Sequence, residues 1–342
     1  MNKSGLFTNT LIGKITKKDI YSHRGVLLLP ASTMLTFGYL KKLIQHGIVL
    51  NIQDVTSIES ADVSFQHTKV IDKTTVELKQ IFKQVRETKQ IPLADLRENI
   101  LPIIQQISTA TPFIGLLNSL QSKDDYTYRH NLAVSALSSL IGKWLGLDHK
   151  TLLQLSTAAL LHDIGKIYIP ESILNKPDRL TDQEFSIMKN HTIFGYEIIE
   201  NSIGTTHRQA LVALQHHERM DGSGYPFGIF KSEIDLFSRI VAVADVFHAM
   251  TSKRIYKNAS PFYEVLLQLE NDTFGALDPF ITRIFVERIM NSLIGSSVLL
   301  TDGSRGIIRM IPKHDPVHPL VQINDNYIDL SKISTIHIDK II

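Results

Sequence analysis

The chain has 342 residues, of which 43% are hydrophobic and 20% charged, and its formal net charge at pH 7 is +2. This length and composition allow a large buried core and exclude a mainly disordered chain, while the near-neutral charge gives no basic field for a nucleic-acid polymer or an anionic membrane. The absence of cysteine excludes disulfides and thiolate-bound metals, and no apolar run reaches the roughly 18 residues of a membrane span, so we expect a soluble, cytoplasmic protein.

Residues 1–72 predict a small α/β accessory domain. An apolar run at 26–29, closed by Pro30, indicates a short strand. A helix follows from Thr36 to a stop at Gly47, and the pattern returns to strand-like runs near 48–52. We expect this domain to regulate or dimerise the protein.

Residues 73–290 predict a helical domain. Residues 73–89 have the spacing of an amphipathic connecting helix, which Pro92 ends. Two apolar stripes, at 132–141 and 152–161, indicate buried helices, and the second runs directly into His162.

Three more helices are predicted in the same domain. Thr181–Glu184 is a capping-box sequence that starts the helix carrying His191. A helix over 207–218 ends at His216 and His217, and a helix over 239–252 carries Asp245.

Residues 291–342 predict a short β appendage. Runs at 298–301 and 306–310 flank Asp302-Gly303 and indicate a hairpin, and shorter strands follow at 320–323 and 327–330. The predicted fold class is mainly α, with a helical core, a small N-terminal α/β domain and this C-terminal β appendage.

Seven histidines and aspartates in the helical region predict a metal site. They are His130, His162, Asp163, His191, His216, His217 and Asp245. A single histidine such as His130 is more often a structural residue of a helix, but the ionised carboxylate of Asp163, at the end of an apolar helix, requires a cation or hydrogen bonds. Imidazoles and carboxylates together suit divalent metals.

The spacing of these residues favours two ions rather than one. Adjacent helical residues diverge by about 100°, so each pair of neighbours can bracket two cations, and the Asp163 carboxylate can bridge them. In this hypothesis one ion is held by His130, His162 and Asp245, and the other by His191, His216 and His217. Two metals about 3.5–4 Å apart suit phosphate-ester hydrolysis by a bridging water or hydroxide.

Other residues near this set are candidates for substrate contact. Lys166, one helical turn after His162 and on the same face, could neutralise a substrate phosphate, or it is a solvated lysine near a helix end. Gly224 and Tyr225 belong to a turn-forming string that could approach an anion and stack on a base, or is only a loop. Arg254 and Lys257 add two cations, which could instead match a helix dipole.

Three strings together resemble the HD-GYP family of HD-domain metallohydrolases. They are His-Asp-Ile-Gly-Lys at 162–166, His-His-Glu-Arg-Met-Asp-Gly-Ser-Gly-Tyr-Pro at 216–226 and Val-Ala-Asp-Val-Phe at 243–247. The resemblance covers roughly residues 120–290 and implies a helical HD fold. It also implies an enzyme that hydrolyses cyclic di-GMP to linear pGpG, and in some members on to GMP, using two or three iron or manganese ions.

The resemblance also assigns roles to residues. The seven histidines and aspartates occupy the positions of the family's metal ligands, and Lys166, Arg254 and Lys257 occupy those of its phosphate contacts. In members with a third metal a glutamate stands where this chain has Tyr126, so two ions are expected, with Asp125 as a misphased substitute. His248 stands where many relatives carry aspartate, which bears on base recognition or adds a nitrogen near the site.

The leading interpretation is a metal-dependent, bacterial second-messenger phosphodiesterase in which Asp163 and Lys166 are catalytic. One alternative is a non-catalytic effector that senses a cyclic dinucleotide, and another is a hydrolase of a different substrate, such as cyclic GMP-AMP or a nucleotide monoester. The sequence does not choose between iron and manganese. The N-terminal domain or the GYP loop is the expected surface for a homodimer or a partner protein.

Overall fold

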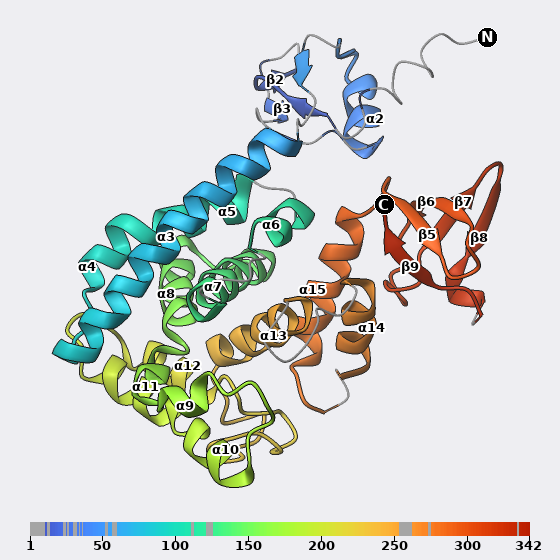
Figure 1. The fold of residues 1–342 in the computed structure, drawn as a ribbon. Coiled ribbons are helices and arrows are strands. Elements are labelled where there is room, and N and C mark those ends of the chain that lie inside the picture. Colours follow the sequence, from blue (N-terminus) through green and yellow to red (C-terminus); the bar gives the residue numbers. More distant parts are fainter. Residues whose placement is uncertain are drawn as a thin grey trace. The chain divides into compact units, whose positions relative to one another are not determined.

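The computed structural model of the chain divides into two compact units, Met1–Gln66 and His67–Ile342 (Figure 1). It describes residues 11, 14–22, 25, 27–29, 33, 35, 37–51, 54–56, 60–110, 113–120, 126–252, 262–272, 275–333 and 335–342. Each unit is considered by itself.

The first unit is a small α/β unit built on two strand pairs and a helix. Strand β1 (Ile15–Thr16) pairs antiparallel with β4 (Val55–Thr56), and β2 (Ile20–Tyr21) pairs with β3 (Leu27–Leu29). Helix α2 (Phe37–Gln45) ends before Gly47, whose φ of 72° suits glycine. The strand expected at 48–52 is absent from the described residues 48–51; Leu50 instead packs in the small core with Leu40 and Leu43.

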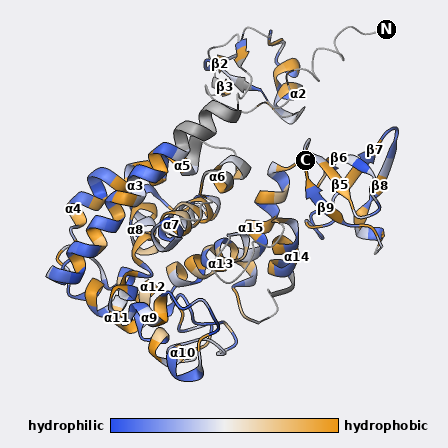
Figure 2. Cartoon of the chain, in the orientation of Figure 1, coloured by the Kyte–Doolittle hydropathy of each residue, from blue (hydrophilic) through white to orange (hydrophobic). Residues whose placement is uncertain are grey.

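Helix α3 (Ser60–Thr88) starts 13 residues before the predicted connecting helix, and its part from His67 onward opens the second unit. It is followed by α4 (Leu93–Asp95), the π-helix η2 (Leu96–Ile100), α5 (Leu101–Ala110) and α6 (Phe113–Leu120). Figure 2 shows hydrophilic and hydrophobic residues side by side along the described part of α3, as expected of a helix buried on one side. Its buried side, including Leu78 and Val85, packs in a core shared with η2 and α5.

The main helical core comprises the helices from α7 onward. They are α7 (Tyr126–Trp144), α8 (His149–Leu161), the 3₁₀ helix η3 (Ile164–Tyr168), α9 (Glu171–Leu174), α10 (Asp182–Lys189), α11 (His191–Glu200), α12 (His207–Gln215), α13 (Leu236–Thr251), α14 (Phe262–Asp272) and α15 (Pro279–Ser292). Helix α7 packs against α5, α8 and α13, and it is buried on more than one side. Leu132 and Ala136 belong to the core with α5, whereas Leu137 and Ile141 belong to a second core with α13 and α15.

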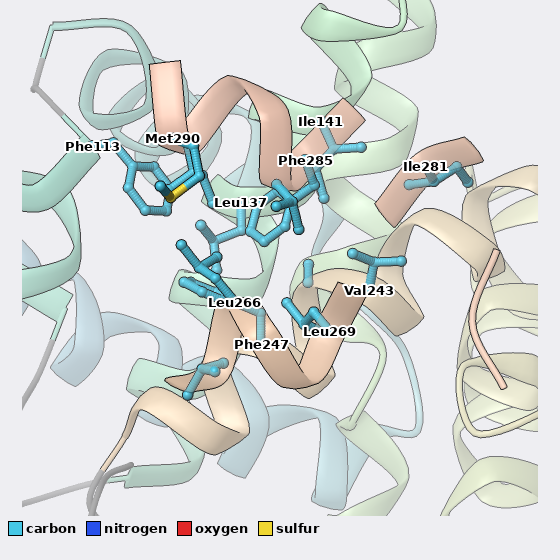
Figure 3. Close-up of a cluster of buried hydrophobic side chains, with 14 of the residues drawn as sticks. Phe113, Leu137, Ile141, Val243, Phe247, Leu266, Leu269, Ile281, Phe285 and Met290 are labelled. Atoms are coloured by element: carbon cyan, nitrogen blue, oxygen red, sulfur yellow. The ribbon is translucent and has the colours of Figure 1, made fainter. Parts of the chain in front are cut away.

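This second core is rich in aromatic side chains (Figure 3). The Phe247 ring meets the Phe285 ring edge-on, with the centroids 4.9 Å apart, and Leu266 and Met290 pack in the same cluster. The cluster extends to buried residues of the C-terminal strands, such as Val298 and Ile308. The C-terminal sheet therefore shares its core with the helices that carry the site.

The C-terminal strands form one antiparallel sheet in the order β8-β7-β6-β5-β9. Its strands are β5 (Ser297–Leu300), β6 (Arg305–Met310), β7 (Leu320–Ile323), β8 (Asn326–Asp329) and β9 (Ile338–Ile341), with the 3₁₀ helix η4 (Leu330–Lys332) after β8. The predicted hairpin is present, and β9, which the sequence reading omitted, pairs with β5 along an edge. The mainly α fold class with small β elements at both ends is confirmed.

None of the described helices combines sufficient length with sufficient hydropathy to cross a bilayer.

Candidate metal centre

Five helical segments bring the seven predicted side chains together. His130 lies on α7, His162 and Asp163 follow α8, His191 begins α11, His216 and His217 follow α12, and Asp245 lies on α13. Their potential ligand atoms form two groups, each within 4.8 Å of one another: one of His130, His162 and Asp245, the other of Asp163, His191, His216 and His217. All are buried except His217, which is half-buried.

The Asp163 carboxylate lies between the two groups. Its Oδ1 is 3.4 Å from His191 Nε2 and 3.7 Å from His216 Nε2. Its Oδ2 is 3.5 Å from His162 Nε2 and 3.9 Å from His130 Nε2. Each oxygen therefore faces a different group of imidazoles, which is the arrangement that a carboxylate shared by two cations requires.

Backbone carbonyls orient three of the imidazoles. The Nδ1–H groups of His162 and His191 donate to the carbonyls of Ala159 and Met188, both at 2.7 Å. His216 Nδ1 lies 3.0 Å from the Ala213 carbonyl. Because a carbonyl only accepts, each ring proton sits on Nδ1, and the Nε2 lone pair faces the centre of the site, as a metal ligand must.

Burial favours the uncharged form of His191, His216 and His217. It lowers the pKa of His191 to about 4 and holds the pKa of His216 and of His217 well below the ordinary value. Burial, the largest single influence, would raise the pKa of Asp163, but the Lys166 ammonium and the surrounding histidines together outweigh it, and the net pKa is well below the usual range. The centre thus contains neutral imidazoles around an ionised, buried carboxylate.

The donor set fits divalent cations. The buried atoms His162 Nε2 and Asp163 Oδ1 have no hydrogen-bond partner, although both face the interior of the cluster. Leaving such atoms unpaired costs free energy, and a cation would satisfy both because the donors are imidazole nitrogens and carboxylate oxygens. The His/Asp cluster is therefore able to bind metal.

Two glycines allow the elements of the centre to approach closely. A methyl group added at Gly165 would overlap the backbone carbonyl of His191, and one at Gly195 would lie 3.1 Å from the Ala213 Cβ. η3 can therefore rest directly on α11, and α11 on α12. This packing places Asp163 beside His191 and His216.

The position of Lys166 differs from the predicted one. The α-helix ends at Leu161, and Asp163, with φ −101° and ψ 11°, leads into the 3₁₀ helix η3, so Lys166 is not one α-helical turn from His162 on a shared face. Its ammonium instead lies 2.5 Å from Asp163 Oδ2. The cation nevertheless lies at the edge of the centre.

His191 also lies on a different helix from the one predicted. The capping box at Thr181 is present, but the helix that it starts, α10, ends at Lys189, and Asn190 separates it from α11. None of the residues of α10 is buried, whereas His191 and Thr192 are. The break lets the chain turn His191 inward while α10 stays at the surface.

The GYP loop folds back on the histidine pair. The Tyr225 ring stacks on the His217 ring at 4.5 Å between centroids, and the Tyr225 N–H donates to the His217 carbonyl. Gly224 is required there because a methyl group would overlap the backbone of residues 217–219. In this structure the tyrosine orders the loop and covers a candidate ligand, and the loop is more than a flexible turn.

Sequence reasoning missed Glu218, which holds this loop. Its side chain is buried and accepts hydrogen bonds from the backbone N–H groups of Phe227, at 2.8 Å, and Ile229, at 3.2 Å. A buried acid next to a histidine pair resembles one more metal ligand in the sequence. Only the fold shows that both its oxygens point into the loop.

The remaining candidates lie partly inside and partly outside the described residues. Arg254, Lys257 and Asp125 lie outside the described residues. Tyr126 stacks on His130, with centroids 5.5 Å apart and the planes 18° from parallel. His248 is buried beside His130, with their Nδ1 atoms 2.9 Å apart.

Comparisons with known proteins agree with this geometry. The HD domain family model matches residues 116–279. The chain is 38% identical over 228 residues to cyclic di-GMP phosphodiesterase PA4108 of Pseudomonas aeruginosa, a match covering 67% of this chain and 55% of the relative. It is 35% identical over 175 residues to 3′3′-cGAMP-specific phosphodiesterase 1 of Vibrio cholerae, covering 50% and 40%.

A solved structure supports the fold. Bd1817, a HDG"Y"P protein from Bdellovibrio bacteriovorus, superposes with a TM-score of 0.51 at 18% identity, covering 81% of this chain and 95% of that one.

The fold and the histidine–aspartate centre define an HD domain. The chain thus contains an HD domain over residues 116–279, and the Gly-Tyr-Pro string at 224–226 beside that centre makes it similar to the HD-GYP proteins. It spans about half the length of the curated relatives that it matches.

Proposed function

We propose that this protein is a metal-dependent phosphodiesterase that hydrolyses cyclic di-GMP to pGpG at a dinuclear centre. The observation that carries the proposal is the Asp163 carboxylate, whose two oxygens face two separate groups of imidazoles. His130, His162 and Asp245 would hold one ion, and His191, His216 and His217 the other. When bound, two divalent cations supply activation of water and charge neutralisation for a phosphodiester.

The chain's own residues would position the substrate. Lys166 places an ammonium beside Asp163, with 24% of its side chain exposed, so it can reach a phosphate at the edge of the centre. Tyr225, stacked on His217, would border the same space and limit access of water. Arg254 and Lys257, by their positions in the family motif, would add further phosphate contacts.

Iron or manganese is the expected metal, since the donors are imidazole nitrogens and carboxylate oxygens and cysteine is absent. The complete set of seven donors argues against a purely sensing role, because a binding protein has no need of two metal-activated positions. We expect the protein to act on the dinucleotide in the cytoplasm, with the N-terminal unit as a regulatory or dimerising element.

A second candidate substrate is 3′3′-cyclic GMP-AMP. The match to the Vibrio cholerae enzyme, at 35% identity, is nearly as strong as the match to PA4108, at 38%. Both substrates present the same phosphodiester to the centre and differ only in one base. The metal arrangement therefore serves either reaction.

The test combines metal content with a panel of substrates. Protein purified without oxygen and loaded with iron or manganese should contain two ions per chain and linearise cyclic di-GMP faster than cyclic GMP-AMP. The variant Asp163→Ala should lose both metal and activity, whereas His149→Ala, at an exposed histidine, should keep both. Tight dinucleotide binding by the two-metal protein without turnover would refute the enzyme in favour of a sensor.

A further inference from the structure

His130 is oriented differently from the other candidate ligands. His162 and His216 lie at the C-terminal ends of helices and His191 at the junction of two, where carbonyls are left without an intrahelical partner and can accept a ring proton. His130 is the fifth residue of α7, and carbonyls within a helix are already engaged. When its Nε2 holds a cation instead of donating to Asp245 Oδ1, which is 2.9 Å away in this structure, its Nδ1 needs an acceptor from elsewhere.

His248 occupies that position. It lies three residues after Asp245 on α13 and is 3% exposed. Its Nδ1 is 2.9 Å from His130 Nδ1, and its Nε2 is 3.1 Å from the Ser252 hydroxyl. Both ring nitrogens therefore face protein groups, so the residue does not offer a nitrogen to a substrate base.

We propose that His248 is a positioning residue for the metal ligand His130: its Nδ1 accepts the His130 ring proton, and its own Nε2–H donates to Ser252. The proposal rests on the dinuclear centre proposed above. If His130 Nε2 binds a cation, the one ring proton of neutral His130 must lie on Nδ1. His248 Nδ1 must then be unprotonated, which places its proton on Nε2, opposite Ser252 Oγ.

The chain of hydrogen bonds has a specific consequence. His130 belongs to the group with His162 and Asp245, while Asp163, His191, His216 and His217 form the other group. Loss of the acceptor at position 248 should therefore lower the affinity for the ion held by the first group and leave the affinity for the second ion unchanged. Removing such a partner of a metal-bound histidine typically costs about 10–100-fold in affinity.

In the experiment a chelator first removes metal from the whole chain, which is then titrated with Mn²⁺. Electron paramagnetic resonance measures the concentration of free Mn²⁺ at each step. His248→Phe keeps a planar ring but removes the acceptor, and we expect it to weaken one of two sites about 10–100-fold. His248→Asn presents a carbonyl oxygen near the place of Nδ1 and should restore affinity. Ser252→Ala, which keeps His248, should weaken the same single site to a smaller extent.

The outcomes separate the inference from the proposed function. Absence of Mn²⁺ binding by the wild-type protein would refute the dinuclear centre itself. Two wild-type sites that persist in His248→Phe, or equal losses in His248→Phe and His248→Asn, would overturn the positioning role and leave the centre intact. If His248→Phe does not fold, judged by thermal unfolding of the metal-free protein, Ser252→Ala decides: unchanged binding at both sites overturns the inference.

Discussion

Gly165 lies against the backbone carbonyl of His191 so closely that no side chain fits between them. We expect Gly165→Ala to push η3 away from α11, with a loss of unfolding free energy of roughly 1–3 kcal/mol, as for overpacked cores, and weaker binding of both metals. Urea unfolding and metal content measure the two effects.

Gly195 supplies the matched comparison, because a methyl group there would lie 3.1 Å from Ala213 Cβ and would displace only a small side chain. Gly195→Ala should be milder in both measurements. Equal metal content in wild type and Gly165→Ala would contradict the view that this contact sets the ligand geometry.

Lys166 is expected to act on the substrate rather than on the metals. Lys166→Met keeps the length of the side chain and removes its charge, so metal affinity should not fall. A hydrogen bond to a charged group contributes about 1.5–3 kcal/mol, so kcat/KM should fall by about 10–150-fold.

Lys176→Met is the control for Lys166. Lys176 Nζ lies 2.6 Å from Glu184 Oε2 with 25% of the side chain exposed, close to the 24% of Lys166, but its partner Glu184 belongs to the surface helix α10. Its kcat/KM should remain at the wild-type value. A similar loss in both variants would mean that the Lys166 effect is general rather than local.

Tyr225 tests the role of the loop. Tyr225→Phe keeps the ring stacked on His217 and should retain metal affinity, whereas Tyr225→Ala removes the ring contact. Aromatic pairs contribute about 0.5–1.5 kcal/mol beyond burial, so Tyr225→Ala should weaken the ion held by His217 by up to about tenfold. Manganese titration of both variants gives the comparison, and a loss in Tyr225→Phe equal to that in Tyr225→Ala would assign the effect to the hydroxyl.

The aromatic core should matter for stability and little for chemistry. Phe285 is fully buried against Phe247, and Phe285→Ala should lower the free energy of unfolding by about 3–5 kcal/mol. Phe280, on the same helix α15 but 67% exposed, provides the control, and Phe280→Ala should change stability little. Denaturant unfolding of the two variants measures the free energies. Comparable losses of unfolding free energy in both variants would contradict a special contribution of the Phe247–Phe285 cluster to stability.

The sequence predicted the helical core because a core follows from local periodicity. The assignment of the candidate ligands to two ions was a hypothesis that spacing alone does not fix, and it stays a prediction, although the structure gathers the same side chains into two groups. The sequence did not predict that the α-helix ends before Asp163, because the 3₁₀ turn depends on the contact of Gly165 with α11, which is distant in sequence. The sequence analysis also predicted one helix where the structure has α10 and α11. The break between them accompanies the burial of His191, which depends on contacts distant in sequence. His248 was expected to bear on base recognition or to add a nitrogen near the site, and Glu218 was not singled out, because the roles of both depend on the loop and the helix that face them.

The hydrogen bonds from His162 and His191 to carbonyls three residues earlier have an evolutionary consequence. A backbone carbonyl remains a hydrogen-bond acceptor when its side chain is substituted. The orientation of these two rings is therefore insensitive to substitutions in the surrounding helices. His130 depends on a neighbour that mutation can replace. Sequence variation among such centres should therefore concentrate at the α7–α13 contact. A single substitution there should change the affinity for one ion and leave the affinity for the other unchanged.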